Sequence, residues 1–220
     1  MLPVNEIFET VQGEASWTGT PAVFVRFQGC DVGCPWCDTK HTWAVDPAKE
    51  VPAAVMFTKR ADSGTYARFF PGDLVLQILS TTTARHVVLT GGEPALYDLT
   101  ALSRVLIEAG RSVQLETSGT SKIQIDAAAF VTLSPKLNMP GGLEVRQDAI
   151  IRGDELKWPV GKPADVERLK HFLTAYRFSG KRVWLQPLSQ SPKATALCIA
   201  AATQNGWRIS VQTHKFLGLR

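Results

Sequence analysis

Three of the four cysteines lie close together in the sequence, at Cys30, Cys34 and Cys37. Structural zinc sites and electron-carrying iron-sulfur sites usually close with four protein ligands. A compact group of three therefore predicts a metal centre with one open coordination position, where a substrate or cofactor can bind. Gly29 and Gly33 allow the loop to turn back on itself so that the three sulfurs converge. The alternative is three cysteines that are buried or disulfide-bonded and hold no metal.

Alternating strands and helices are predicted to carry this loop. Because the strands are separated by helices, they should form a parallel sheet with right-handed crossovers. The predicted strands are residues 6–11, 22–27, 86–90, 112–115, 130–133, 155–157, 182–185 and 207–211. The predicted helices are residues 73–79, 99–109, 164–176 and 194–204.

The segment 44–71 shows a weaker pattern than the rest of the chain. Pro47, Pro52, Gly64 and Pro71 interrupt it, and its charges are mixed. We interpret it as a long connection, with at most a short helix, inserted within a single domain that covers residues 1–220. Connections of this length inside a compact domain are often lids or partner surfaces.

Polar motifs follow the carboxyl ends of successive predicted strands, and the cysteine loop lies in the same position after the strand at 22–27. In parallel α/β sheets and barrels, ligands bind at this edge. The cysteines and the motifs should therefore lie around the same end of the sheet, which predicts a catalytic site in a partial barrel. In chain order the motifs are Gly91-Gly92-Glu93-Pro94, Glu116-Thr117-Ser118-Gly119, Ser134-Pro135-Lys136, Gln186-Pro187 and Gln212-Thr213-His214-Lys215.

Composition limits the classes of protein that need to be considered. The 220 residues are 45% hydrophobic, which is enough for a large core, and the formal charge of +4 is spread without a dense basic block. We therefore expect no direct contact with nucleic acid. No apolar run reaches the roughly 18 residues needed to span a bilayer, and the N-terminus lacks the pattern of a signal peptide. These features predict a cytoplasmic protein without membrane contact, and a reducing compartment suits free thiols.

The cysteine loop resembles that of the radical S-adenosylmethionine (SAM) superfamily, including Trp36 just before the last cysteine. In that superfamily three thiolates hold a 4Fe-4S cluster, and SAM binds the fourth iron through its amino and carboxylate groups. Two more stretches narrow the resemblance to the 7-carboxy-7-deazaguanine synthase family of enteric bacteria, over nearly the whole chain. They are Val11-Gln12-Gly13-Glu14 and Cys37-Asp38-Thr39-Lys40-His41-Thr42-Trp43. The implied fold is α/β, a radical SAM partial (β/α) barrel of parallel strands with outer helices.

The resemblance implies roles for the strand-end motifs. In the superfamily a motif like Gly91-Gly92-Glu93-Pro94 binds the amino group of SAM, since the glycines allow close approach and the carboxylate accepts from an ammonium. Taken singly, each later polar residue could equally be a helix cap or a surface group. The predicted SAM-binding residues are Trp36, Cys37, Asp38, Gly91, Gly92, Glu93, Glu116, Ser118, Ser134, Pro135, Lys136, Gln186 and Pro187.

Thr39 distinguishes this family, in which the threonine two positions after the last cysteine supplies an oxygen ligand to a Mg²⁺ ion that also binds the substrate. The family's substrate is 6-carboxy-5,6,7,8-tetrahydropterin. Its N-H and amino groups could donate hydrogen bonds to the Glu14 carboxylate. Arg26 interrupts a buried strand and so must be paired. It either meets the substrate carboxylate, positions Glu14 or forms an internal salt bridge. The predicted substrate-binding residues are Val11, Gln12, Gly13, Glu14, Arg26, Thr90 and His214, of which His214 would close the pocket.

The implied activity is that of a carbon-nitrogen lyase. An electron enters the cluster and cleaves SAM, and the resulting 5′-deoxyadenosyl radical abstracts hydrogen from C6 of the pterin. The ring then contracts and loses ammonia, giving 7-carboxy-7-deazaguanine, a precursor of queuosine in tRNA. The resemblance also implies a flavodoxin-like electron donor and a homodimer.

Two other functions remain open at this point. A glycyl-radical activase would share the cysteines and Gly91-Gly92-Glu93-Pro94, but it would not need Thr39 or Gln12-Gly13-Glu14. A zinc-stabilised binding module or a simple electron carrier would need four protein ligands. Cys198 lies in an apolar helical stretch, which indicates a small buried hydrophobic residue and not a fourth ligand.

Overall fold

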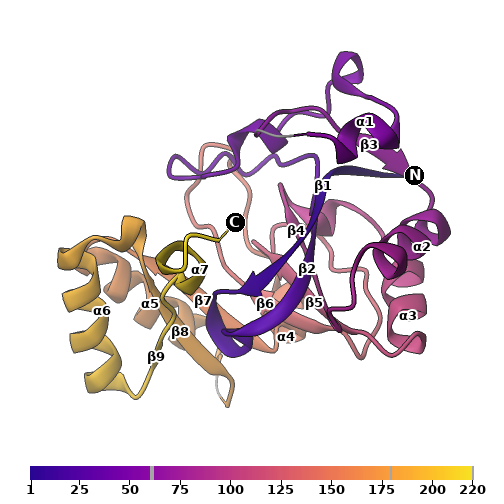
Figure 1. Cartoon of the computed structure of the whole chain (residues 1–220). Helices are drawn as coiled ribbons and strands as arrows, with labels where there is room; N and C mark the ends of the chain where they lie inside the picture. Colours follow the sequence, from indigo (N-terminus) through magenta and orange to yellow (C-terminus); the bar gives the residue numbers. More distant parts are fainter. Residues whose placement is uncertain (60–61, 179, 220) are drawn as a thin grey trace.

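A computed structural model describes residues 1–59, 62–178 and 180–219. Residues 60 and 61, which belong to the expected connection at 44–71, lie outside the described residues, as do 179 and 220. Within the described ranges, one curved sheet of nine strands has the order β3-β1-β2-β4-β5-β6-β7-β8-β9. Its two edges, β3 and β9, do not pair with each other, so the barrel is open (Figure 1).

The seven strands β2, β4, β5, β6, β7, β8 and β9 are parallel to their neighbours, which confirms the predicted α/β arrangement. Their bounds are β2 Thr20–Phe27, β4 His86–Gly91, β5 Ser112–Thr117, β6 Phe130–Leu133, β7 Glu155–Val160, β8 Arg182–Pro187 and β9 Arg208–Ile209. Outer helices cover this part of the sheet, namely α2 Pro71–Thr81, α3 Thr100–Glu108, α4 Gln147–Arg152, α5 Pro163–Ala175 and α6 Pro192–Asn205.

The N-terminal edge of the sheet differs from the parallel prediction. The strand β1, Leu2–Gln12, is antiparallel to β2, and β3, Ala67–Phe69, is antiparallel to β1. Only residues 13–19, which include a 3-10 turn at Ala15–Trp17, join β1 to β2. A connection this short can join antiparallel neighbours, whereas a parallel pair needs a crossover of a dozen or more residues.

The segment 44–71 contains one short helix, as expected, but it also supplies a strand that was not predicted. The helix is α1, Ala53–Phe57, and the strand is β3, which pairs with β1 through Leu2 and Phe69. A strand of only three residues is too short to show alternation in the sequence. The segment therefore extends the sheet and is more than a connection.

The two faces of the parallel strands differ in chemistry, because side chains alternate between them. One face packs against the outer helices in two apolar clusters, one around β2, β4, α2 and α3 and the other around β7, β8, α5 and α6. Val87, Leu89, Val113 and Leu115 belong to the first cluster, and Leu156 and Leu185 to the second. The alternate positions of these strands carry many polar residues, including His86, Gln114, Glu116, Glu155 and Lys157.

The C-terminal segment returns to the open side of the barrel. After β9, the short helix α7, Thr213–Phe216, lies beside the loop that follows β1 (Figure 1). The Thr213 amide donates to the Gly13 carbonyl at 3.0 Å, and the Ser210 hydroxyl accepts from the Ala15 amide at 2.9 Å. These contacts join the two ends of the chain across the gap that the sheet leaves. Among the described residues, no helix is long and apolar enough to span a bilayer.

Candidate active site

The cysteine loop begins after the carboxyl end of β2. The fully buried Gln28, just before the loop, holds it in place through side-chain hydrogen bonds. The Gln28 amide donates to the carbonyls of His41 and Ala44 at 3.0 and 2.7 Å, and it accepts from Asn5 at 2.7 Å. Gly29 has a φ of +106°, a conformation that favours glycine. The loop therefore begins at a fixed point and turns sharply toward the mouth of the barrel.

Cys30, Cys34 and Cys37 are free thiols that line the same cavity of about 410 Å³. No group of three or more His, Cys, Asp or Glu side chains within the described ranges is placed to hold a single metal ion. Cys198 is completely buried in the apolar cluster around α6, which confirms its interpretation as a core residue. Three thiols on one loop, with the fourth cysteine in the core, do not fit the four-ligand zinc module.

Burial determines the protonation of two of the thiols. It raises the pKa of Cys30 to about 11 and raises that of Cys34 as well. These two thiols stay neutral near pH 7, which does not suit nucleophilic catalysis by a free thiolate. A bound metal ion would have to displace their protons before they could act as ligands.

The Gly91-Gly92 pair brings the end of β4 against the cysteine loop. A side-chain Cβ at Gly92 would lie 2.1 Å from the Gly29 carbonyl oxygen and 3.1 Å from the Cys30 Cβ. The Glu93 amide donates to the same Gly29 carbonyl at 2.7 Å. This close approach requires glycine, and it fixes the distance between the first cysteine and β4.

The Glu93 carboxylate, which is 2% exposed, is already surrounded by donors from the protein. It accepts from the Thr117 hydroxyl at 2.6 Å, from the Ser118 and Ala95 amides at 2.8 and 3.0 Å, and from the Ser118 hydroxyl. A carboxylate offers about four acceptor sites. Glu93 thus connects the ends of β4 and β5, in addition to lining the cavity.

Arg26 forms the internal salt bridge that was one of its three expected roles. Its Nε lies 2.6 Å from an oxygen of Glu6, the residue opposite it on β1, and its guanidinium lies over the Phe8 ring. Arg26 also lines the cavity, whereas Glu14 takes its charged partner from elsewhere. Near the cysteines, the Thr39 hydroxyl lies 3.5 Å from the Cys37 sulfur and faces the same cavity.

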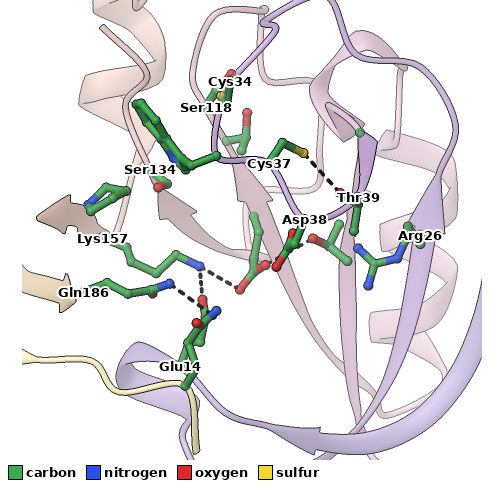
Figure 2. Close-up of a pocket in the computed structure, with 18 of the residues that line it drawn as sticks. Glu14, Arg26, Cys34, Cys37, Asp38, Thr39, Ser118, Ser134, Lys157 and Gln186 are labelled. Carbon is green, nitrogen blue, oxygen red and sulfur yellow. Dashed lines mark hydrogen bonds and ion pairs between the residues drawn. The ribbon is translucent and has the colours of Figure 1, made fainter. Parts of the chain in front are cut away.

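The opposite wall of the cavity is built around Glu14 in the turn after β1, Glu116 on β5 and Lys157 on β7. Figure 2 shows Glu14 and Lys157 pointing toward each other. The Lys157 ammonium contacts a Glu14 oxygen closely and lies 3.4 Å from a Glu116 oxygen. The other Glu14 oxygen accepts from Gln212 at 2.8 Å and from Gln186 at 3.3 Å. Burial raises the pKa of Glu14, but Lys157 outweighs it and lowers the pKa to about 2. Glu14 is therefore a carboxylate at any physiological pH.

A buried polar network supports this wall from inside the barrel. The Gln12 side-chain amide donates to Glu116 at 3.2 Å and to the Gln114 side-chain oxygen at 3.1 Å. The His86 Nε2 also contacts the Gln114 side-chain oxygen at 2.9 Å, and the His86 ring stacks on Trp17 with the ring centroids 4.2 Å apart. Gln12 is thus held both by the barrel interior and by its own turn, where its side-chain oxygen accepts from the Glu14 backbone amide at 3.1 Å.

The C-terminal segment completes the pocket, as expected for His214. A Cβ at Gly13 would lie 2.1 Å from the His214 Nδ1, so the turn after β1 and this histidine are in close contact. Lys215 donates to the Gln212 side chain at 2.7 Å and lies 3.9 Å from Asp38 of the cysteine loop. Burial lowers the pKa of His214. The segment thus contacts both walls of the cavity.

The structure gathers nearly all the predicted site residues around one cavity. Gly13 and Pro135 lie beside its wall, where the Gly13 carbonyl accepts from Thr213 and Pro135 is buried. The predicted residues that line the cavity are Val11, Gln12, Glu14, Arg26, Cys30, Cys34, Trp36, Cys37, Asp38, Thr39, Thr90, Gly91, Gly92, Glu93, Glu116, Ser118, Ser134, Lys136, Gln186, Pro187 and His214.

Sequence reasoning missed Lys157, Gln212 and Gln114. Lys157 and Gln114 occupy positions that alternate with apolar residues in β7 and β5, so the signal was present as polar residues at a spacing of two. Polar residues inside a buried strand must have partners, which makes such positions candidates for a site. Gln212 belongs to the motif Gln212-Thr213-His214-Lys215, of which only His214 was assigned a role. Its contact with Glu14, 198 positions away in the sequence, leaves no local signal.

No protein-family model matches the chain. The curated 7-carboxy-7-deazaguanine synthase of Escherichia coli K12 is 46% identical over 219 residues, which is 99% of this chain and 98% of that protein. The synthase of Buchnera aphidicola is 38% identical over 220 residues, 99% of each chain. Among solved structures, the crystal structure of QueE from Escherichia coli superposes with a TM-score of 0.92 at 45% identity, covering 96% of this chain and 93% of that one.

Proposed function

The chain belongs to the 7-carboxy-7-deazaguanine synthase family, and we propose that it is a radical SAM lyase. It converts 6-carboxy-5,6,7,8-tetrahydropterin to 7-carboxy-7-deazaguanine with loss of ammonia, a step of queuosine biosynthesis. The observation that carries the proposal is the shared cavity. It brings three free cysteines together with the wall formed by Glu14, Lys157 and Glu116, which we call the Glu14 wall. A glycyl-radical activase has no use for an enclosed wall of this kind.

Cys30, Cys34 and Cys37 would hold the 4Fe-4S cluster, which together with bound SAM supplies the radical chemistry of the superfamily. The cluster ligands leave one iron for SAM, as the open position of a three-cysteine loop requires. The protein's contribution is to bind, to orient and to exclude water. The contact between Gly92 and Gly29 supports this role, because it fixes the loop against the strand end where SAM is expected.

SAM is proposed to lie between the cysteine loop and the ends of β4 to β8. Glu116, Ser118, Ser134, Lys136 and Gln186 line that part of the cavity. The Gln186 side-chain oxygen is buried and has no hydrogen-bond partner in the described part of the chain. An unpaired buried acceptor is costly, so it favours a donor supplied by a ligand, such as a ribose hydroxyl.

The pterin is proposed to lie against Gln12, Glu14, Arg26 and His214. An ionised Glu14 accepts from two neighbouring N-H groups, which suits the guanine-like edge of the pterin. Arg26 lines the same cavity, and the carboxylate of the substrate would bind its guanidinium alongside the existing salt bridge to Glu6. Thr39 would contribute its hydroxyl to a Mg²⁺ ion that also binds the substrate, since hydroxyl and carboxylate oxygens suit this cation.

The family resemblance extends the proposal to partners. A flavodoxin-like protein would donate the electron, and two copies of the chain would form a homodimer. Residues 1–220 would act as one domain, since the nine-stranded sheet runs through it and β3 joins the segment 44–71 to that sheet. A reducing compartment such as the cytoplasm suits its free thiols.

The test is anaerobic reconstitution with iron and sulfide, followed by incubation with SAM, dithionite, Mg²⁺ and the pterin. Mass spectrometry should detect 7-carboxy-7-deazaguanine. Cleavage of SAM to 5′-deoxyadenosine without this product would contradict the substrate, and absence of a cluster would contradict the proposal as a whole. Activity that did not depend on Mg²⁺ and that was retained in the Thr39→Ala variant would contradict the role of Thr39.

A further inference from the structure

Lys157 is a buried cation that neither the cysteine loop nor the strand-end motifs account for. It is the third residue of β7, and its side chain is only 10% exposed. Its two partners come from distant parts of the chain, Glu14 after β1 and Glu116 on β5. Lys157 thus contacts both carboxylates of this wall.

The two carboxylates have different surroundings apart from Lys157. Glu116 accepts from Gln12 at 3.2 Å and from Thr90 at 3.1 Å. Glu14 accepts from Gln186 and Gln212. All four of these donors are neutral, and burying a carboxylate beside neutral donors alone is costly. The Lys157 ammonium supplies positive charge beside both carboxylates, and it is the group that most lowers the pKa of Glu14.

We propose that Lys157 is a positioning residue for the substrate. Its ammonium holds Glu14 in the ionised form and in the orientation that accepts the N-H groups of the pterin, and it connects Glu14 to Glu116 on the SAM side. The inference rests on the proposed function, and it adds a residue that prepares Glu14 to bind the pterin. A lysine that served stability alone would leave substrate binding unchanged when replaced by a residue of similar shape.

The charges that face Glu14 decide how the site responds to pH. They are Lys157 on β7, Glu116 on β5, His214 on α7 and, farther away, Lys136 after β6. In Lys157→Met, burial and the neighbouring Glu116 both favour the protonated form of Glu14. Pterin affinity in this variant should therefore rise with pH as Glu14 loses its proton, whereas the wild-type affinity should not depend on Glu14 near neutral pH.

The experiment compares Lys157→Met and Lys157→Arg with the wild-type protein. The first readout is the Kd for the pterin, measured by fluorescence titration of cluster-free protein at several pH values. The second is the ratio of 5′-deoxyadenosine to 7-carboxy-7-deazaguanine formed by the reconstituted enzyme. Lys157→Met should weaken pterin binding at least about tenfold and raise the ratio, and Lys157→Arg should recover part of both.

Lys181→Met is the matched control. Lys181 is also a lysine that caps polar groups, since its ammonium donates to the Ile151 carbonyl at 2.7 Å and to the Gly153 carbonyl, but it does not line the cavity. This variant should lower thermal stability and leave both readouts within about twofold of the wild type. A change of the product ratio in Lys181→Met would show that destabilisation alone produces the effect, which would overturn the inference.

The double variant Glu14→Gln/Lys157→Met keeps the inference falsifiable if the single variant fails to fold. It removes both charges of the close pair, so it leaves no unpaired Glu14 carboxylate. If Lys157 acts through Glu14, its pterin affinity should equal that of Glu14→Gln alone. A further loss that simply adds to the loss in Glu14→Gln would overturn the inference.

Two results separate this inference from the proposed function. If the wild-type protein forms the product and Lys157→Met binds the pterin equally well, the inference is wrong and the function stands. If the wild-type protein forms no product from the pterin, the function is wrong, and the inference fails with it.

Discussion

The cysteine wall and the Glu14 wall of the cavity place their polar groups by different means. Cys30, Cys34 and Cys37 come from one loop, whose path is set by Gly29 and by the backbone contact with Gly92. Glu14 instead meets three side chains from β7, β8 and the C-terminal segment. The first wall depends on backbone geometry within short motifs, and the second depends on charges and hydrogen bonds between distant elements.

This difference predicts that the two walls fail in different ways. A change in the cysteine wall should remove the cluster and with it all chemistry. A change in the Glu14 wall should leave the cluster and SAM cleavage in place and impair the use of the pterin. The ratio of 5′-deoxyadenosine to product, measured together with iron content, distinguishes the two failures.

The largest effect is expected for replacement of a cluster cysteine. Cys34→Ala should bind substantially less iron and lose activity down to the background. Three thiolates bind three of the four irons and leave one for SAM, so the loss of one thiolate destabilises the cluster. Iron and sulfide analysis and the visible absorption of the reconstituted protein are the measurements. Cys198→Ala is the control, and it should keep the iron while losing about 1 kcal/mol of stability. Equal iron loss in both variants would contradict the assignment of the ligands.

A smaller but still severe effect is expected for Gly92→Ala, which tests the backbone part of the cysteine wall. The added Cβ would collide with the Gly29 carbonyl, so the variant should lose about 2 kcal/mol or more of unfolding free energy and retain less iron. Chemical denaturation and iron analysis measure both. Gly72→Ala is the control, since a Cβ there meets nothing within 4 Å, and it should be neutral or stabilised. A Gly92→Ala protein with full iron content would show that the close approach is dispensable.

The Glu14 wall can be tested through the pH dependence of stability. The pKa of Glu14 is about 2 in the folded protein, below its ordinary value of 4.5. A lowered pKa stabilises the fold above the ordinary value, and this contribution disappears as the pH falls toward the folded pKa. The stability difference between wild type and Glu14→Gln should therefore shrink by about 2 kcal/mol between roughly pH 6 and pH 3.

Urea denaturation at several pH values measures this difference. Glu167→Gln is the control, because Glu167 is 62% exposed and pairs with Lys170 only at the surface. Its stability difference from the wild type should stay nearly constant with pH. A constant difference for Glu14→Gln as well would mean that Lys157 does not stabilise the charged form of Glu14.

The smallest effect is expected for Gln212→Ala, which removes one neutral donor from Glu14. Gln186 and Lys157 remain, so the loss should be about 1 kcal/mol, or roughly fivefold in the KM for the pterin. SAM cleavage without the pterin should be unchanged. Gln204→Ala, an exposed position on α6, should behave as the wild type. If Gln212→Ala instead lost iron, the two walls would not be separable.

The predictions that held were those that depended on short stretches of chain. The cysteine loop, the glycine pair after β4 and the alternation of strands and helices are each encoded within a few neighbouring residues. The antiparallel edge was missed in part because β3 has only three residues, and the helix at 147–152 because its pattern spans less than two turns.

The site residues that were missed share a different cause. Lys157 has no motif around it, and its contact with Glu14, 143 positions earlier, is visible only in the folded chain. The same holds for Gln114, which contacts Gln12 and His86 from a strand of its own. Glu93 was expected to face a ligand, and only the packed structure shows that four donors from the protein already surround it.

The sequence by itself determined the course of the cysteine loop, the glycines that allow its turns and the end of the parallel strands at which the polar motifs gather, because spacing and backbone preference act over a few residues. Only the tertiary structure decided which charge pairs with Glu14, which donors occupy Glu93 and where the C-terminal segment closes the open barrel. Those contacts arise when parallel strands bring side chains more than a hundred positions apart to one edge. Buried charges and amides there must find partners, and the choice of partner depends on packing across the whole sheet.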